Sequence, residues 1–300
     1  MFSAYNKTPI QTIDTANRNI SVFSIDGKNI DPEVVKTFGD EWLKFNAFSD
    51  ESINLQGHRY FDILDEKMIN KNVYGIDIGC GTGRWTKYLS DKVGFIEAVD
   101  PSDAVFAADK LLKGVNNVRI TKAAVETIPF DDETFDFAMS VGVLHHIPNT
   151  QNAMIDCVKK VKRGGYFYCY LYYSLDNRGI LFKLLFEASD LIRKIVSRLS
   201  PGPKKFVCDV LAVIFYMPFV FLSRFLDFAG FKKMAKKIPL SEYASARFFV
   251  IRNDSLDRFG TRLEQRFSKE EVIKMMSNSG LDNIVVGENA PYYCAVGQRK

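Results

Sequence analysis

The chain has 300 residues, of which 47% are hydrophobic and 25% charged, with a formal net charge of +4. This length and apolar content suit one large globular domain, or one domain with a substantial insertion, and they argue against disorder. The small net charge argues against a strongly nucleic-acid-binding chain, for which a basic stripe is expected.

The basic residues are concentrated in one segment. Residues 174–247 contain 13 Lys and Arg against 6 Asp and Glu, a net charge of +7, which leaves −3 for the rest of the chain. The five cysteines lie far apart without a CxxC pair, so neither a zinc site nor a disulfide framework is indicated and no metal is expected. The N-terminus lacks the charged and apolar regions of a secretory signal. These features predict a cytoplasmic protein.

The chain begins with a segment that we expect to be mainly helical. After a polar start, the stretch FGDEWLKFNAF repeats its aromatic residues at helical spacing and so gives one apolar stripe. A helix packed on the core is the expected result.

From residue 73 to residue 173 the pattern alternates between strand-like and helical segments. Apolar strand-like runs occur at 73–78, 94–100, 118–125, 135–141 and 165–173. Helical patterns occur between them at 84–93, 104–114 and 150–164. This alternation predicts a parallel sheet with helices on both faces, and such sheets bind ligands at the carboxyl ends of their strands.

A glycine-rich loop follows the first of these strands in GIDIGCGTGRW. Gly79, Gly81 and Gly83 are spaced GxGxG, whereas a dinucleotide fingerprint is spaced GxGxxG, so the pattern favours a nucleoside ligand without phosphates. About twenty residues later, the next strand ends at Asp100, which can accept hydrogen bonds from both ribose hydroxyls. A turn-forming Asp before Pro101 is the alternative, but its separation from the glycine loop makes the nucleoside interpretation stronger.

Four motifs in order resemble those of a known enzyme family. IDIGCGTG, AVDPS, VETIPFDDETFDFAMSVGVLHHIPN and VKRGGYFYCY are similar to the motif series of the class I S-adenosylmethionine-dependent methyltransferases. The similarity is to the bacterial subgroup with a VLHHI-type loop after strand 4, whose substrates are unassigned. It implies an α/β fold with a Rossmann-like seven-stranded mixed sheet of order 3-2-1-4-5-7-6, helices on both faces and a helical insertion after strand 5.

The resemblance also implies a division of the chain into four parts. These are an N-terminal helical segment over the cofactor site (1–70), a cofactor-binding core (71–173), a helical cap insertion (174–265), and the last helix with the closing strand pair of the core (266–300).

The same resemblance implies which residues bind S-adenosyl-L-methionine. They are Asp77, Gly79, Gly81 and Gly83 for its methionine and ribose parts, Asp100 for the ribose hydroxyls, and Ser102 and Asp103 beside the adenosine. Relatives often carry an Asp for the adenine where this chain has Ala124. We therefore expect backbone atoms and Val125 or Glu126 to recognise the adenine.

Two adjacent histidines, His145 and His146, follow the fourth strand, at the sheet edge where an acceptor is expected. Histidine titrates near neutrality, so either one can take a proton from a substrate hydroxyl, although packing within the loop is the alternative. We predict that His146 is the proton acceptor and His145 is structural. In the charged stretch NDSLDRFGTRLEQRF, Arg262 and Glu264 are candidates for the acceptor pocket, with solvated surface as the alternative.

The insertion combines apolar and basic residues. Residues 179–199 have the pattern of an amphipathic helix. Residues 210–222 are thirteen consecutive apolar residues, fewer than the roughly 20 that span a bilayer, and Pro218 is expected to kink or break a helix there. No transmembrane segment is therefore expected. The mixture predicts a lipid-like acceptor, a lipid-linked saccharide, or attachment to the inner face of an anionic membrane.

These observations predict an S-adenosylmethionine-dependent methyltransferase. The expected reaction is O-methylation of a lipid-like acceptor, a lipid-linked saccharide or another small molecule. A tRNA methyltransferase is one alternative, against which the weak net charge counts, so nucleic acid is not the expected partner. A non-catalytic protein that binds the cofactor or docks on a membrane is another alternative.

Overall fold

The structure is a computed structural model that describes residues 3–44, 48–174, 180–236, 238–244, 248–291 and 293–300. The chain divides into two compact units, which are described separately below. The first unit comprises residues 1–176 and 263–300, and the second comprises residues 177–262.

The first unit is built on one mixed sheet. Its strands are β1 (Gln11–Asp14), β2 (Asn19–Val22), β3 (Tyr74–Ile78), β4 (Phe95–Asp100), β5 (Val118–Lys122), β6 (Phe135–Val141), β7 (Val161–Tyr170), β8 (Leu281–Val286) and β9 (Cys294–Arg299). They lie in the order β1-β2-β5-β4-β3-β6-β7-β9-β8. The run from β2 to β7 is parallel, whereas β9 is antiparallel to both of its neighbours.

The fold class predicted from the sequence is confirmed, and the order of the seven core strands is the predicted one. The predicted count of seven strands is wrong, because the hairpin β1-β2 extends the sheet beyond β5. The segment 1–70, predicted to be helical, therefore also contains two strands. The two strands have four residues each, and β2 finds its partner in β5 about a hundred residues later, so the local pattern is too short to reveal them.

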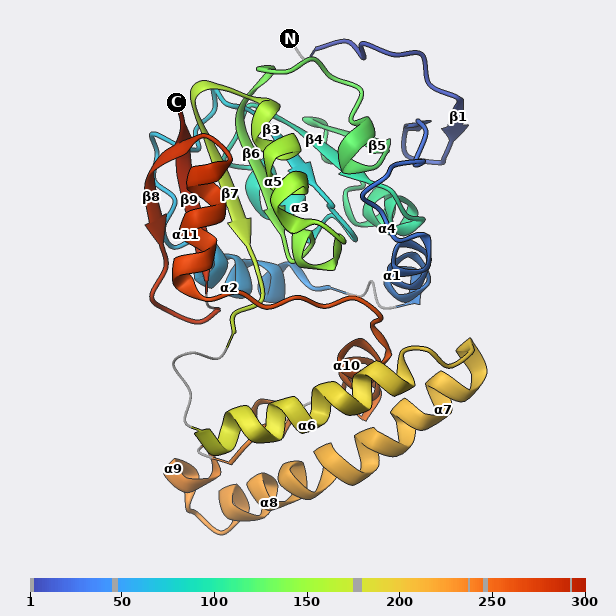
Figure 1. The fold of residues 1–300 in the computed structure, drawn as a ribbon, viewed down its shortest axis with the longest axis vertical. Helices are drawn as coiled ribbons and strands as arrows, with labels where there is room; N and C mark the ends of the chain where they lie inside the picture. The colour runs from blue at the N-terminus through green and yellow to red at the C-terminus, as the bar shows by residue number, and fades with distance from the viewer. Residues whose placement is uncertain (1–2, 45–47, 175–179, 237, 245–247, 292) are drawn as a thin grey trace. The chain divides into compact units, whose positions relative to one another are not determined.

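Helices cover both faces of this sheet (Figure 1). In chain order they are α1 (Pro32–Lys44), α2 (Asp50–Tyr60), α3 (Arg84–Ser90), α4 (Ala104–Leu111), the 3-10 turns η1 (Val125–Thr127) and η2 (Leu144–His146), α5 (Thr150–Lys159) and α11 (Lys269–Asn278). The helix expected over 150–164 ends earlier, at Lys159, because Val161 already pairs with Phe135 in the sheet. Asn149 caps α5 by accepting a hydrogen bond from the backbone N–H of Asn152.

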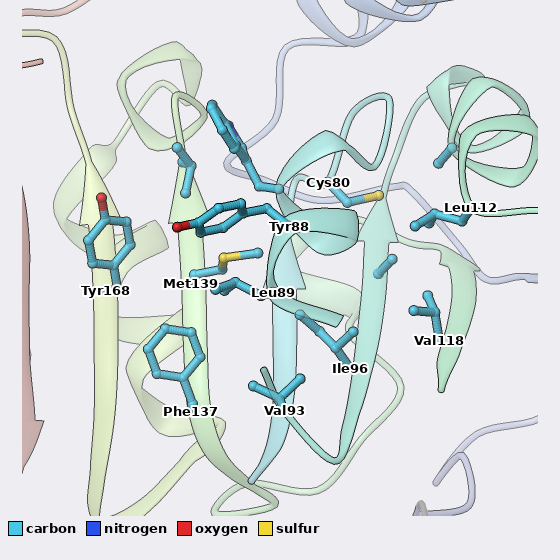
Figure 2. Packing of buried hydrophobic residues seen from close by; sticks show 14 of the residues in the cluster. Cys80, Tyr88, Leu89, Val93, Ile96, Leu112, Val118, Phe137, Met139 and Tyr168 are labelled. Carbon is cyan, nitrogen blue, oxygen red and sulfur yellow. The ribbon is translucent and has the colours of Figure 1, made fainter. Parts of the chain in front are cut away.

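The core lies in two layers, one on each face of the sheet. One layer is formed with α2, α3 and α4, and Figure 2 shows Tyr88 and Leu89 of α3 beside Met139 of β6. The other layer is formed with α5 and α11, including the fully buried Met154 and Met276. Burial on both faces explains why the central strands are nearly continuous apolar runs.

The second unit is helical. It contains α6 (Ile180–Val196), α7 (Pro201–Leu211), the π-helical turn η3 (Ala212–Tyr216), α8 (Met217–Phe228), α9 (Lys232–Ala235), the 3-10 turn η4 (Ser241–Tyr243) and α10 (Phe248–Gly260). Its core packs Cys208, Ala212, Tyr216 and Val220 against Ile251 and Phe259 of α10.

The apolar run 210–222, in which Pro218 was expected to kink or break a helix, lies in a continuous helix. Pro218 does not break the helix, because the π-helical turn η3 directly precedes α8 and the helical chain continues from α7 to α8 (Figure 1). A π turn accommodates the missing N–H and the ring of a proline. The helix Gly202–Phe228 thus has 27 residues, a mean hydropathy of 2.2 over its most apolar window, and the length and composition to cross a membrane.

Candidate active site

The glycine loop joins β3 to α3, and all three of its glycines have a positive φ. The φ values are +80° at Gly79, +53° at Gly81 and +76° at Gly83. This left-handed region favours glycine, and a Cβ at Gly79 would lie 2.5 Å from the Val143 side chain. The loop therefore excludes side chains and lies directly against the segment that leads to the two histidines.

Asp100, at the carboxyl end of β4, is bound to this loop. Its Oδ2 accepts a hydrogen bond from the Gly81 N–H at 2.9 Å, and its Oδ1 accepts from the N–H and hydroxyl of Ser102 at 2.8 and 2.6 Å. Burial raises the pKa of Asp100, and the hydrogen bonds from Ser102 and Gly81 oppose that rise. A carboxylate has about four acceptor positions, so lone pairs remain for two ribose hydroxyls.

Asp77, in β3, is the second buried carboxylate beside the loop. Its Oδ2 accepts a hydrogen bond of 2.6 Å from the Thr86 hydroxyl at the start of α3. Burial raises the pKa of Asp77 to about 7, and the nearby Asp100 charge adds to the rise. Two buried acids at the carboxyl ends of adjacent strands form an environment that favours a cationic ligand group.

The expected adenosine end of the site is a cavity of about 410 Å³. Ser102 and Asp103 line it from the end of β4, and α1 together with the loop before it forms the other wall. Gly39 of α1 packs closely here, because a Cβ at this position would lie 3.1 Å from the Asp103 backbone nitrogen. The structure thus brings together the two residues assigned to the adenosine and the helix that precedes the core.

Val125 and Glu126 lie in the 3-10 turn η1 after β5. The Glu126 Oε2 accepts a hydrogen bond of 3.0 Å from the Asn29 N–H, and a Cβ at Gly27 would overlap the same oxygen. The Glu126 carboxylate is therefore bound to the N-terminal loop. A role for either residue in adenine recognition stays a prediction.

Arg84 is the first residue of α3, directly after the glycine loop. Its guanidinium lies 4.5 Å from the Trp85 ring centroid, 5.4 Å from Phe48 and 5.8 Å from Trp42. Burial lowers its pKa, and within the described residues it makes no hydrogen bond or ion pair. The Arg84 guanidinium is thus a cation packed among aromatic rings next to the glycine loop, and its N–H groups can donate hydrogen bonds to an anion.

His145 is fully buried after β6. Its ring stacks on Tyr172 with centroids 3.9 Å apart, and neither ring nitrogen has a hydrogen-bond partner within the described part of the chain. Burial lowers its pKa well below the usual value, with His146 and Arg266 lowering it further. The ring is therefore neutral at physiological pH.

His146 differs from its neighbour by its hydrogen bond. Its Nδ1 lies 2.7 Å from the backbone oxygen of Leu263, and its ring centroid lies 4.7 Å from that of Phe38 in α1. A carbonyl oxygen can only accept, so Nδ1 carries the proton and the neutral ring keeps its lone pair on Nε2. The side chain is 6% exposed. This tautomer is the one that a general base at Nε2 requires.

A short segment, residues 263–267, crosses the carboxyl ends of β6 and β7 and holds both histidines. Besides the Leu263 contact, the Gln265 N–H donates to the His145 oxygen at 3.0 Å, and the Gln265 side-chain amide donates to the Ile147 oxygen at 2.8 Å. Farther on, the Phe267 N–H donates to the Tyr172 oxygen at 2.9 Å. We call residues 263–267 the crossing segment.

The two predicted acceptor residues fall in different units. Glu264 lies in the crossing segment, and its side chain is 4% exposed. Its carboxylate forms an ion pair of 2.7 Å with Arg266. The Arg266 guanidinium in turn lies 5.1 Å from the Tyr172 ring centroid. Arg262 lies in the helical unit, where its backbone oxygen accepts from Arg193 at 3.2 Å. The structure places Glu264 in the segment that contacts the histidines, and a role for Arg262 in the acceptor pocket stays a prediction.

Sequence reasoning missed three contributors to this site. Arg84 had a local signal, because it is the first residue after the glycine loop at the start of a helix. Tyr172 and the Leu263 backbone oxygen had none, because their contacts with the histidines join residues far apart in the chain; the Leu263–His146 pair spans 117 residues.

The comparison with protein families gives one match. A family model described as a methyltransferase domain matches residues 76–169, which run from β3 through β7. The matched range contains the glycine loop, Asp100 and both histidines.

Curated relatives cover different parts of the chain. It is 30% identical over 112 residues to a sterol 4-C-methyltransferase of Caenorhabditis elegans, covering 36% of this chain and 34% of that protein. It is 26% identical over 210 residues to an uncharacterized protein of Methanocaldococcus jannaschii, covering 68% and 77%. It is 24% identical over 157 residues to a ubiquinone biosynthesis O-methyltransferase of Coxiella burnetii, covering 51% and 65%. The match with the sterol methyltransferase thus spans about one third of that protein's length, and the match with the ubiquinone biosynthesis methyltransferase spans just under two thirds.

Solved structures also resemble the chain. An S-adenosylmethionine-dependent methyltransferase of Thermotoga maritima is 17% identical with a TM-score of 0.48, covering 89% of this chain and 99% of that one. The YcgJ protein of Bacillus subtilis is 16% identical with a TM-score of 0.43, covering 81% and 99%.

Proposed function

Residues 76–169 are a methyltransferase domain of the S-adenosylmethionine-dependent class I family, and we propose that the protein transfers the cofactor's methyl group to a hydroxyl oxygen of a lipid-like acceptor. The observation that carries the proposal is the hydrogen bond from His146 Nδ1 to the Leu263 oxygen. With Nδ1 bonded in this way, the neutral ring has its lone pair on Nε2, and the loop that carries His146 packs through Val143 against Gly79 of the glycine loop.

The residues of the site fit the cofactor. The glycines of the loop have no side chains and positive φ angles, so a ligand can approach the backbone. The Asp100 carboxylate can accept hydrogen bonds from the ribose hydroxyls. Asp77 supplies a buried negative charge for the cationic ammonium group, and we assign the Arg84 guanidinium to the carboxylate. Bound S-adenosylmethionine supplies a methyl group already activated by its sulfonium, so the protein's task is mainly alignment.

His146 is proposed to remove the acceptor proton. With Nδ1 held by the Leu263 oxygen, Nε2 can accept the proton of a hydroxyl as that oxygen attacks the methyl carbon. His145 is fully buried and stacked on Tyr172, so we propose that it supports the loop and does not exchange protons. The Nδ1 hydrogen bond of His146, which has no counterpart on the His145 ring within the described residues, supports this division of roles.

The surroundings of His146 support an apolar acceptor with one polar group. The rings of Phe38, His145 and Tyr172 lie around the His146 ring, with centroids 4.2 to 5.7 Å away. The names of the curated relatives point to sterol and ubiquinone substrates, both lipid-like molecules. A lipid-linked saccharide or another small molecule with a hydroxyl group is the wider class to which the proposal extends.

The first experiment measures the transfer itself. Purified protein is incubated with cofactor labelled in its methyl group and with lipid, glycan and RNA fractions of the source cell. We expect label in the lipid fraction, in a bond that the product's mass spectrum assigns to oxygen. Label in RNA would favour a tRNA methyltransferase, and label on carbon would contradict the hydroxyl acceptor.

A second experiment measures binding by calorimetric titration. We expect S-adenosylmethionine and S-adenosylhomocysteine to bind and NAD not to bind, because the GxGxG loop lacks the pyrophosphate spacing. Binding of the cofactor without transfer to any fraction would instead support a non-catalytic partner protein.

A further inference from the structure

The long helix formed by α7, η3 and α8 is apolar on all sides from Val210 to Leu222, with charged residues only before and after that run. Cys208, Ala212, Tyr216 and Val220 are buried inside the helical unit. Other large apolar side chains of this helix are exposed, namely Phe206, Val210, Val213, Ile214, Phe215, Phe219, Phe221, Leu222, Phe225 and Phe228. We call these ten residues the outer face. A helix that is apolar all round is found in a protein core or in contact with lipid.

The inner side of the same helix is bound to polar groups of the helical unit. The Tyr216 hydroxyl pairs with Asp254 of α10 at 2.7 Å, and Arg252 of α10 forms an ion pair with Asp209 of α7. The Ser255 hydroxyl donates to the Cys208 oxygen at 2.7 Å. A bilayer-spanning helix would carry these charged partners into hydrocarbon, which is costly. The geometry therefore favours a helix that lies along a membrane surface, with its inner side on α10 and its outer face in lipid.

Basic residues gather at both ends of the outer face. Lys205 is exposed and Lys204 is half-buried at the start of α7, and Lys232, Lys233 and Lys236 are exposed just beyond α8. Between α8 and the following turns lies a cavity of about 640 Å³, whose lining includes Arg224, Lys236, Asp227 and Phe228. Lysines at the ends of an apolar face can extend to the phosphates of a bilayer while the face enters the acyl layer.

The charge of the helical unit argues against a second copy as the occupant. Residues 177–262 contain 16 Lys and Arg against 7 Asp and Glu, a net charge of +9. Two such surfaces facing each other would repel, whereas an anionic lipid surface attracts both. Phe228 is 91% exposed and Phe206 is 69% exposed, and both lie near the lysines at the ends of the helix. Large apolar side chains next to lysines suit the boundary between lipid headgroups and acyl chains.

We propose that the outer face of the helix Gly202–Phe228 is a peripheral docking surface for an anionic lipid bilayer. Phe221, Phe225 and Phe228 enter the acyl layer, and Lys204, Lys205, Lys232 and Lys233 contact the lipid phosphates. The inner side stays on α10. This surface is separate from the methyl-transfer chemistry, and its test requires neither cofactor nor acceptor.

The test is flotation of the full-length protein with vesicles of phosphatidylcholine, with and without phosphatidylglycerol. We expect flotation with the anionic vesicles, weaker binding as salt rises because the charge attraction is screened, and release by alkaline carbonate without detergent. Phe225→Glu should weaken vesicle binding by about tenfold or more, since one inserted aromatic side chain is lost. Lys232→Glu combined with Lys233→Glu should remove the preference for anionic lipid.

Matched controls change the same chemistry elsewhere. Leu55→Glu alters a 60% exposed apolar residue of α2, and Lys67→Glu combined with Lys71→Glu reverses two exposed lysines of the first unit. Neither control should alter flotation, and circular dichroism checks that each variant folds. The proposal is overturned if the protein stays in solution with anionic vesicles, or if the Phe225 variant binds like the controls. Release by detergent alone would show a spanning helix, and a dimer that Phe225→Glu dissociates, without lipid binding, would show a second copy.

Discussion

Single residues of the cofactor site carry the strongest electrostatic constraints, and Asp77 is the clearest case. Its pKa rises from 3.8 in the unfolded chain to about 7 in the fold. The folded state therefore binds more protons than the unfolded state between these values, so the contribution of Asp77 to the free energy of unfolding decreases as pH rises from about 4 to about 7. A shift of this size corresponds to at most about 4 kcal/mol.

We expect Asp77→Asn to remove this contribution and to flatten the pH dependence of stability in that window. Urea unfolding between pH 4.5 and about 8 measures the effect. Asp100→Asn should change the slope as well, because burial also raises the pKa of Asp100 and its charge contributes to the raised pKa of Asp77. An unchanged pH slope in Asp77→Asn would show that the group titrates at its ordinary value.

Arg84 gives a prediction about ligand affinity. If its guanidinium binds the cofactor's carboxylate, Arg84→Met should weaken S-adenosylmethionine binding about ten- to a hundredfold, because a charged hydrogen bond is lost. Affinity for 5′-methylthioadenosine, which has no carboxylate, should change little. Calorimetry with both ligands separates the two effects, and equal losses for both would assign Arg84 to packing with Trp42 and Trp85.

The two histidines are expected to respond differently to substitution. His146→Ala should lower turnover by about 10² to 10⁴ when the acceptor is a hydroxyl. His145→Ala should act mainly on stability, since the ring is fully buried against Tyr172. Single-turnover rates measure the chemical step once the acceptor is known. Near-normal chemistry in His146→Ala would show that alignment alone suffices.

At the scale of elements, the contact between the glycine loop and the loop after β6 can be tested with two glycines. Gly79→Ala and Gly81→Ala both place a Cβ at positive φ, which costs about 1–2 kcal/mol each. The Cβ at Gly79 would clash with the Val143 side chain at 2.5 Å, whereas the Cβ at Gly81 would lie 3.6 Å from the Trp42 side chain, which is an ordinary contact distance. We therefore expect the Gly79 variant to be the less stable of the two by urea unfolding without ligand. Equal losses would mean that the loop after β6 moves freely away.

Elements were predictable where the signal is local. The glycine loop and Asp100 are each readable within a few residues, and the structure places Asp100 against the loop as expected. The boundary between α5 and β7 could not be predicted in this way. The helical pattern continues past Val161, but Val161 pairs with Phe135 in the sheet. The hairpin β1-β2 and the continuous helix through Pro218 also depend on partners or turns that the local pattern does not show.

The candidate site shows the same division. The residues that surround the expected cofactor come from consecutive motifs, so the sequence predicted their approach to one edge of the sheet. The tautomer of His146 depends on a backbone oxygen 117 residues away, and the ring contact of Arg84 with Trp42 joins two helices. No periodicity encodes such contacts, because packing decides them.

At the scale of the whole molecule, the first unit is made of two stretches of sequence, 1–176 and 263–300, and the helical unit is inserted between them in the chain. Tyr173 and Phe267 form a parallel bridge, and the Ser174 N–H donates to the Phe267 oxygen at 2.9 Å, so the two segments that flank the insertion lie side by side. The partners of Asp77, Asp100 and His146 described above also belong to this unit. We therefore expect cofactor binding to depend on the first unit.

This separation predicts the outcome of replacing residues 178–261 by a short Gly-Ser linker. The affinity for S-adenosylhomocysteine should stay within about twofold of the full chain, since the hydrogen-bond partners described above for Asp77, Asp100 and His146 all lie in the first unit. Vesicle flotation should be lost, and methyl transfer to the acceptor should fall if the insertion shapes the acceptor site. Calorimetry, flotation and the labelled-methyl assay on the same preparation measure the three properties independently. Loss of cofactor binding in a folded deletion variant would show that the helical unit completes the cofactor site, whereas retained flotation would move the lipid-binding surface to the first unit.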